Sequence, residues 1–162
     1  MDADRLATLF DAHAAALALY ARQWLDRAAA EDVVQEAYVR LMLQTSEPDN
    51  AKAWLFRTAR NEAISQTRSR LRRSRREQSE MRPPWFEPSN GASIDAAQAK
   101  AAMQTLPVLQ REVIVLRIWA GMTLKDIATM VELPVSSVFD QYRQGIAKIR
   151  EQMGEICLIK LK

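Results

Sequence analysis

The apolar residues of this chain recur at steps of three and four positions, which is the spacing of helices with one buried face. In the first segment this spacing predicts a helix that ends near Asp26. Its buried stripe is expected to consist of Leu6, Phe10, Leu17, Tyr20 and Trp24. The pattern shows no strand-like alternation before the last residues, and the chain has only four glycines. The predicted fold class is therefore all-α.

A second helix is predicted from about Ala29 to Leu43. Its inward positions are Val33, Val34, Ala37, Tyr38 and Leu41, and its outward, mostly acidic positions are Glu31, Asp32, Gln35, Glu36 and Arg40. Residues 44–50 have the composition of a loop, since Pro48 does not continue a helix. A third helix is predicted from about Ala51 into a run of arginines.

Helix-breaking residues gather after this run, at Pro83, Pro84, Pro88, Asn90 and Gly91. They predict a linker over residues 79–94. The chain is therefore expected to form two small helical domains, residues 1–78 and 95–162, on either side of this linker.

The second domain has the pattern of a helix-turn-helix. A helix with Pro107 in its first turn is predicted to run to Ala120 and to be closed by Gly121. Thr123 and Asp126 then predict a capping box for a short helix, with Leu124, Ile127, Ala128 and Val131 buried.

A tight turn is predicted over residues 132–135, and Ser136 is expected to cap the last helix. The inward residues of that helix would be Val138, Tyr142, Ile146, Ile149 and Met153. Two short helices joined by such a turn typically place the second helix in the major groove of DNA.

Charge is distributed unevenly along the chain. The net charge of +3 is the sum of −5 in residues 1–50, +7 in residues 51–82 and +1 in residues 83–162. Six arginines lie between Arg68 and Arg76, directly behind an aromatic stretch that contains Trp54 and Phe56. Guanidinium groups beside aromatic rings suit a charged, unstacked nucleic-acid strand. The alternative is a solvated, disordered run of charge.

Other features exclude whole classes of function. One histidine, His13, one cysteine, Cys157, and no phosphate-binding glycine loop offer no catalytic set, so an enzyme is not expected. No cofactor or metal site is predicted, and His13 is expected to be a packing or surface residue. The apolar runs are too short for a bilayer and the first residues lack a secretory signal, which favours a cytoplasmic protein without membrane insertion.

Three segments resemble, in the same order, motifs of the extracytoplasmic-function (ECF) sigma factors. Residues 30–41, AEDVVQEAYVRL, resemble the helix that binds the polymerase clamp, and residues 53–61, AWLFRTARN, resemble the promoter-melting helix. Residues 106–123, with Asp126, Ile127 and Ala128 after them, are similar to the second domain of the family. The resemblance implies a sigma factor that directs core RNA polymerase to specific promoters and initiates transcription.

The resemblance also implies sites in the first domain. Core RNA polymerase would bind Asp32, Gln35, Glu36 and Arg40, although these residues also fit a plain solvated helix face. The loop of residues 44–50 would capture a base flipped out of the minus-ten element. Residues implied in promoter melting are Thr45, Ser46, Asn50, Trp54, Arg57, Arg60, Asn61, Arg68, Arg70, Arg72 and Arg73. Trp54 is open to two interpretations, as a core residue or as a stacking platform.

The last helix departs from the family pattern of a small residue followed by Thr-Val-Lys-Ser-Arg. Phe139 and Gln141 stand where lysine and arginine are expected, and Asp140 would repel phosphate. The residues implied in upstream-element binding are Ser136, Ser137, Phe139, Asp140, Gln141, Arg143 and Lys148. The sequence is compatible with a contact between Phe139 and a thymine methyl group, and with a hydrogen bond between a base edge and Asp140 or Gln141.

Two other functions remain open at this point. One is a stand-alone helix-turn-helix regulator that binds duplex DNA without polymerase. The other is an interaction module whose second domain receives an anti-sigma factor. The expected partners are core RNA polymerase, promoter DNA and an anti-sigma factor.

Overall fold

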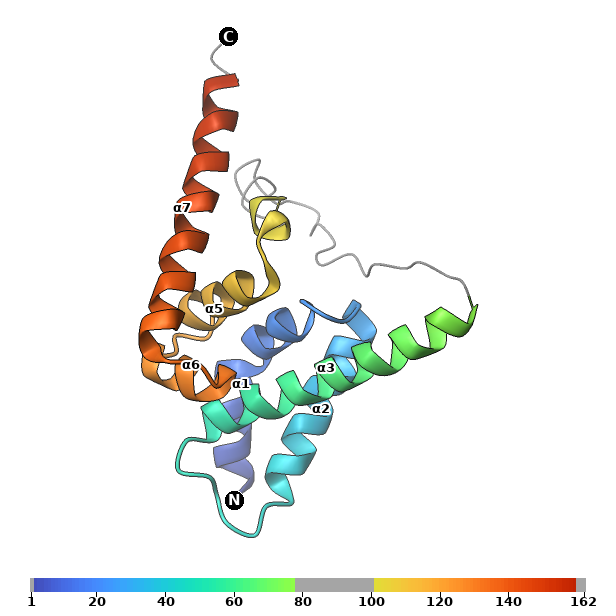
Figure 1. The fold of residues 1–162 in the computed structure, drawn as a ribbon. Coiled ribbons are helices and arrows are strands. Elements are labelled where there is room, and N and C mark those ends of the chain that lie inside the picture. The colour runs from blue at the N-terminus through green and yellow to red at the C-terminus, as the bar shows by residue number, and fades with distance from the viewer. Residues whose placement is uncertain (1, 78–100, 160–162) are drawn as a thin grey trace. The chain divides into compact units, whose positions relative to one another are not determined.

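The computed structural model describes residues 2–77 and 101–159, with side chains for residues 2–72 and 101–153. The helices are α1 (Ala3–Ala21), α2 (Arg27–Met42), α3 (Ala51–Glu77), α5 (Val108–Ile118), α6 (Leu124–Val131) and α7 (Val135–Ile159), as drawn in Figure 1. Residues 101–105 are also helical. No strand occurs in the described ranges, which confirms the all-α prediction. The chain divides into two compact units, residues 1–85 and 86–162.

The first unit is built from α1, α2 and α3, which all contact one another. Its core contains Leu17, Tyr20, Leu55 and Phe56, each of which is completely buried. The ring of Tyr20 lies 5.5 Å from that of Phe56, between ring centroids. All five inward residues predicted for the second helix are buried, and all five outward ones are exposed.

The first two helices meet at a tighter turn than the sequence predicted. α1 ends at Ala21 instead of near Asp26, because the N–H groups of Gln23, Trp24 and Leu25 bond back to the carbonyls of Tyr20 and Ala21. Asp26 instead caps α2, accepting a 2.9 Å hydrogen bond from the N–H of Ala29. This hydrogen bond is the main reason why the pKa of Asp26 is lowered, and the hydrogen bond and charge of Arg70 lower it further, by a smaller amount.

The prediction that Phe10 is buried was wrong. Its side chain is 46% exposed, and its ring lies 5.0 Å from the ring of Tyr38. Tyr38 is buried, and its hydroxyl donates a 2.9 Å hydrogen bond to the carbonyl of Leu9. Burial raises the pKa of Tyr38 to about 12. The exposed ring of Phe10 therefore covers a buried phenol instead of lying in the core.

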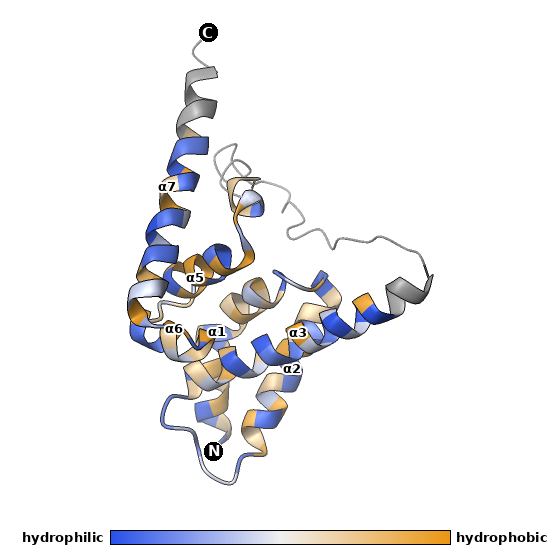
Figure 2. Cartoon of the chain, viewed as in Figure 1, coloured by the Kyte–Doolittle hydropathy of each residue, from blue (hydrophilic) through white to orange (hydrophobic). Residues whose placement is uncertain are grey.

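The second unit packs α5 against α7 at a very short distance. Figure 2 shows α5 as largely hydrophobic and the middle of α7 as largely hydrophilic. At the contact, a Cβ atom on Gly145 would lie 2.7 Å from Cδ1 of Ile114. The Nε2 of Gln110 donates a 3.2 Å hydrogen bond to Oε1 of Gln144 beside it. The missing side chain of Gly145 is thus what allows the two helices to approach.

The helix-turn-helix is present, with some shifted boundaries. Thr123 and Asp126 form the predicted capping box at the start of α6. α6 ends at Val131 and is followed by its C-cap residue Glu132, whose φ of 59° is left-handed, and α7 begins at Val135. Ser136 therefore lies inside the first turn, and its prediction as the cap was wrong.

The boundaries of α5 also differ from the prediction. Pro107 precedes the helix as its N-cap residue, instead of lying in its first turn. The helix ends at Ile118, two residues before Ala120, and Gly121 follows with a φ of 59°. The helices of the second unit therefore occur in the predicted order, but several of them begin or end at other residues than predicted.

Candidate nucleic-acid interface

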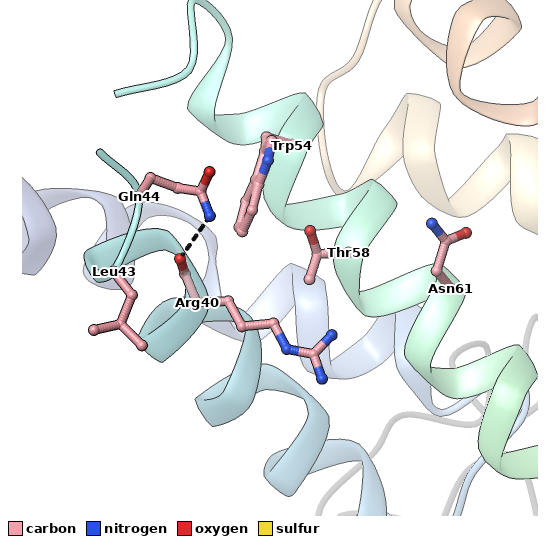
Figure 3. A pocket seen from close by; sticks show the side chains of 6 residues that line it. All are labelled: Arg40, Leu43, Gln44, Trp54, Thr58 and Asn61. Carbon is pink, nitrogen blue, oxygen red and sulfur yellow. Dashed lines mark hydrogen bonds between the residues drawn. The ribbon is translucent and has the colours of Figure 1, made fainter. Parts of the chain in front are cut away.

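A pocket of about 310 Å³ lies between α2 and α3. Figure 3 shows the six residues that line it: Arg40, Leu43, Gln44, Trp54, Thr58 and Asn61. The indole of Trp54 reaches from α3 toward Gln44, and the side chain of Arg40 extends from α2 toward α3 (Figure 3). The lining thus combines apolar and aromatic walls with amide, hydroxyl and guanidinium groups.

Arg40 is held in place by two carboxylates. Its Nε donates a 2.7 Å hydrogen bond to Glu36 on its own helix, and its Nη2 donates a 3.3 Å bond to Glu62 on α3. The bond to Glu36, more than the charge of Glu62, raises the pKa of Arg40. This predicted polymerase-binding residue therefore also lines the pocket and joins α2 to α3.

The loop of residues 43–50 is anchored at both ends. Gln44 donates from Nε2 to the carbonyl of Arg40 at 3.1 Å, and Asn50 caps α3 by accepting a 2.9 Å bond from the N–H of Ala53. In the middle, Arg5 of α1 pairs with Glu47 at 3.2 Å. Thr45 and Ser46 are exposed beside the pocket lining but are not among its residues.

The pocket continues as a polar stripe along one face of α3. Trp54, Thr58 and Asn61 follow one another at steps of four and three residues, so they share a face of the helix. The same periodicity places Arg68 and Arg72 on this face, and both are exposed. The structure therefore aligns the pocket with two of the arginines that the sequence singled out.

The other arginines of α3 are arranged differently. Arg70 lies on the opposite face, where its Nη1 donates a 3.0 Å bond to Asp26. Arg57 is exposed near the stripe and Arg60 is half-buried away from it. Arg73 belongs to α3, but its side chain lies outside the described residues.

The predicted polymerase-binding surface is the exposed face of α2, with Asp32, Gln35 and Glu36. Exposed apolar side chains follow it toward the end of the helix, namely Val39 (45%), Met42 (52%) and Leu43 (73%). Sequence analysis missed this apolar extension. The sequence did contain a signal for it, because Val39 is apolar but is not one of the predicted inward positions of the helix.

The second unit presents the start of α7. Ser136, Phe139, Asp140 and Arg143 are exposed there, whereas Ser137 and Gln141 are half-buried toward the unit. Asp140 lies 3.7 Å from Arg143, between a carboxylate oxygen and Nη2. Lys148 is exposed further along the helix.

Comparison with known proteins gives the same assignment for both units. Residues 9–76 match the family "Sigma-70 region 2", and residues 96–149 match "Sigma-70, region 4". The chain is 30% identical to the ECF RNA polymerase sigma factor SigL of Mycobacterium tuberculosis, over 96% of this chain and 92% of SigL. The chain belongs to the ECF sigma factors.

Other relatives of this sigma factor agree. It is 24% identical to the ECF sigma factor SigK of Mycolicibacterium vanbaalenii over 94% of the chain. Its fold resembles that of the sigma factor RpoE in complex with the anti-sigma factor NepR from Bartonella quintana, with a TM-score of 0.74 over 93% of this chain and 97% of RpoE. It also resembles CnrH in complex with the cytosolic domain of CnrY, with a TM-score of 0.63.

The family settles the general function. This sigma factor directs core RNA polymerase to specific promoters and initiates transcription. Sigma factors are generally regulators and not enzymes. Within the described residues, no helix is both long and apolar enough to cross a membrane.

Proposed function

We propose that the first unit opens promoter DNA by holding one unstacked base of the minus-ten element in the pocket between α2 and α3. The observation that supports this most strongly is the alignment of the pocket with Arg68 and Arg72 on one face of α3. A base in the pocket and the phosphates of its strand on the arginines would follow the same line along the helix.

The lining of the pocket fits the chemistry of a flipped base. Taking a base out of the duplex costs a few kcal/mol, which stacking and hydrogen bonds must offset. Trp54 offers a ring face, and stacking on an aromatic side chain contributes about 1–3 kcal/mol per base. Thr58 and Asn61 offer hydrogen-bond donors and acceptors for the base edge. This proposal favours Trp54 as a stacking residue, since it lines the pocket and is only half-buried.

The same unit is proposed to bind core RNA polymerase through α2. Asp32, Gln35 and Glu36 form an exposed acidic face that suits a basic partner helix. The apolar side chains of Val39 and Met42 lie next to it and would add buried area at the centre of the contact. Residues 1–78 would thus act as the polymerase-binding and melting domain, and residues 95–162 as the upstream-binding domain.

The proposal extends to place and partners. The protein would work in the cytoplasm, where the polymerase lies, and the catalysis of RNA synthesis would belong to the polymerase alone. An anti-sigma factor is proposed as a further partner. Two proteins with a similar fold are found in complexes: RpoE with the anti-sigma factor NepR, and CnrH with the cytosolic domain of CnrY. Exposed Ile118 and Trp119 at the end of α5 offer it an apolar contact.

Run-off transcription with core polymerase and a pool of genomic promoters tests the leading proposal. A promoter found in this way is then labelled with 2-aminopurine at successive minus-ten positions. Fluorescence should rise at one position as the base leaves the stack. Trp54→Ala should reduce this signal and the rate of opening about tenfold, as expected for the loss of one stacking contact.

Trp119→Ala is the matched control, since it removes a tryptophan that is half-exposed in the other unit. It should leave the fluorescence change intact. Equal loss of signal in both variants, or opening by Trp54→Ala at the normal rate, would contradict base capture in this pocket.

A crosslinking experiment tests the anti-sigma partner separately. A photoreactive amino acid at position 119 would be introduced in the native host, and the crosslinked proteins identified by mass spectrometry. A crosslink to a protein that also inhibits run-off transcription would support the partner. Crosslinks to polymerase subunits alone would argue against it.

A further inference from the structure

The first two turns of α7 present an unusual set of side chains to solvent. Phe139 is 49% exposed and Val135, one turn before it, is 47% exposed. Val138 between them points the other way and is completely buried. The helical spacing of four residues places Val135 and Phe139 next to each other, so together they form a small apolar patch at the start of the second helix of the helix-turn-helix.

The charges around this patch nearly cancel. Asp140 follows Phe139 directly, and its carboxylate lies 3.7 Å from the guanidinium of Arg143. The side chains of both are largely exposed, 70% for Arg143 and 52% for Asp140. A phosphate near Phe139 would therefore meet a carboxylate before it met an uncompensated cation. The patch is poorly suited to binding the DNA backbone.

The position of the patch points to a base edge instead. In helix-turn-helix proteins, residues at the start of the second helix contact base edges in the major groove. The apolar group exposed there is the C5-methyl of thymine. Two side chains are too small a patch for a stable protein interface, which buries roughly 1,200–2,000 Å² in total. A thymine methyl is the occupant whose size and chemistry match it.

We propose that Phe139, with Val135 beside it, reads a thymine methyl group in the upstream promoter element and gives this sigma factor a preference for thymine there. This inference rests on the proposed role of the second unit in binding upstream DNA. Specificity at this position would come from apolar contact, while the carboxylate of Asp140 would accept a hydrogen bond from an amino group of the neighbouring base.

Replacing thymine by deoxyuridine tests the inference, because it removes only the methyl group. The full chain with core polymerase first selects active promoters from a library randomised upstream of the minus-ten element. On a selected promoter, each upstream thymine is then replaced in turn, and the initiation rate is measured below saturation. We expect the initiation rate to fall about fourfold at one or two positions, which is the factor that corresponds to the free energy of burying one methyl group.

The variant Phe139→Ala should transcribe the thymine and deoxyuridine promoters at the same rate. A second pair of promoters carries cytosine or 5-methylcytosine at a position that is sensitive to deoxyuridine. With the normal protein, the methyl group of 5-methylcytosine should restore the initiation rate that is lost with cytosine. Val108→Ala is the matched control: Val108 is 49% exposed in the same unit but lies at the start of α5, outside the helix-turn-helix. It should keep the full sensitivity to deoxyuridine.

The opposite results are equally clear. Initiation that is insensitive to every upstream deoxyuridine, or a Phe139→Ala variant that keeps the sensitivity, would overturn the inference while leaving sigma activity intact. A uniform loss on all promoters in Phe139→Ala would assign this residue to folding or to a protein contact. Absence of any initiation from the library would instead count against the proposed function itself.

Discussion

On α3, Arg68 and Arg72 share a helix face with the pocket, whereas on α7 the exposed start of the helix carries Phe139 and the ion pair of Asp140 with Arg143. The first surface carries two exposed guanidinium groups, and neither forms an ion pair within the part of the chain whose side chains the structure describes. The second is nearly neutral. The difference suggests two ways to bind one polyanion: a separated strand held through its phosphates, and a duplex distinguished through the shape of its base edges.

The expected effect that tests this contrast most directly is on the salt dependence of DNA binding. In Arg68→Ala/Arg72→Ala, the slope of log affinity against log salt should fall by about 1.4 for single-stranded DNA, since each lost phosphate contact contributes about 0.7. Between 50 and 200 mM salt, the affinity of the double variant would then fall by a factor about seven times smaller than the factor for the normal protein. Binding of holoenzyme to a fluorescent, melted promoter over a salt series measures this slope.

Arg70→Ala is the matched control on the same helix, because Arg70 faces Asp26 on the opposite side. Its slope should stay that of the normal protein. If Arg70→Ala flattened the slope as much as a single Arg68→Ala change, the α3 stripe would not be the strand-binding face and the contrast between the two units would fail.

The next effect tests how the second unit supports its helix. Gly145→Val should destabilise the contact of α5 with α7 by about 1–3 kcal/mol, because the added atoms collide with buried Ile114. Hydrogen exchange followed by mass spectrometry should show faster exchange in α5 and α7 and no change in α1 to α3. Ala147→Val is the control, since it places the same side chain at an exposed position of the same helix, and it should leave the exchange of α5 unchanged.

A smaller effect concerns the first unit and its pH dependence. Tyr38→Phe loses the 2.9 Å hydrogen bond to Leu9 and should cost about 1 kcal/mol. Burial raises the pKa of Tyr38 from its ordinary value near 10 to about 12. The stability from the neutral phenol is thus fully present below pH 10 and is lost as the pH rises toward 12.

Urea unfolding of both proteins between pH 8 and 12 separates these contributions. The difference in stability between Tyr38→Phe and the normal protein should shrink, and then change sign, as the pH rises through this window. A constant difference would show that Tyr38 is more solvated than its burial indicates.

The smallest expected effect is a gain at the turn before α7. Glu132 adopts a left-handed conformation with φ 59° and ψ 43°, which costs less for glycine than for other residues. Glu132→Gly should therefore stabilise the second unit by about 0.5 kcal/mol, after the loss of chain entropy is subtracted. Glu132→Ala removes the same charge but keeps the Cβ atom, so a gain in both variants would point to charge instead of conformation.

Much of the fold was predictable because local signals agree with the packing. The buried face of α2 and the capping box of Thr123 with Asp126 follow from residue spacing alone, and both are confirmed. The end of α1 was not predictable in this way. The pattern of apolar residues continues through Trp24, while the backbone leaves the helix after Ala21 and Asp26 caps the next helix.

The candidate site was only partly predictable. The sequence indicated Trp54 and Asn61, but it gave no reason to add Thr58 or Leu43, because a pocket lining depends on how two helices lie side by side. The run of arginines in the sequence also suggested one continuous basic surface, which the structure does not form. Helical geometry divides it, with Arg68 and Arg72 on the pocket face and Arg70 bonded to Asp26.

The double carboxylate contact of Arg40 has a consequence for genetics. This one side chain borders the proposed base pocket and also restrains Glu36 on the proposed polymerase surface. An allele at this position would therefore show mixed phenotypes, a weaker assembly with polymerase together with poorer strand separation. Second-site suppressors of such an allele would map to two different macromolecules, the enzyme and the promoter.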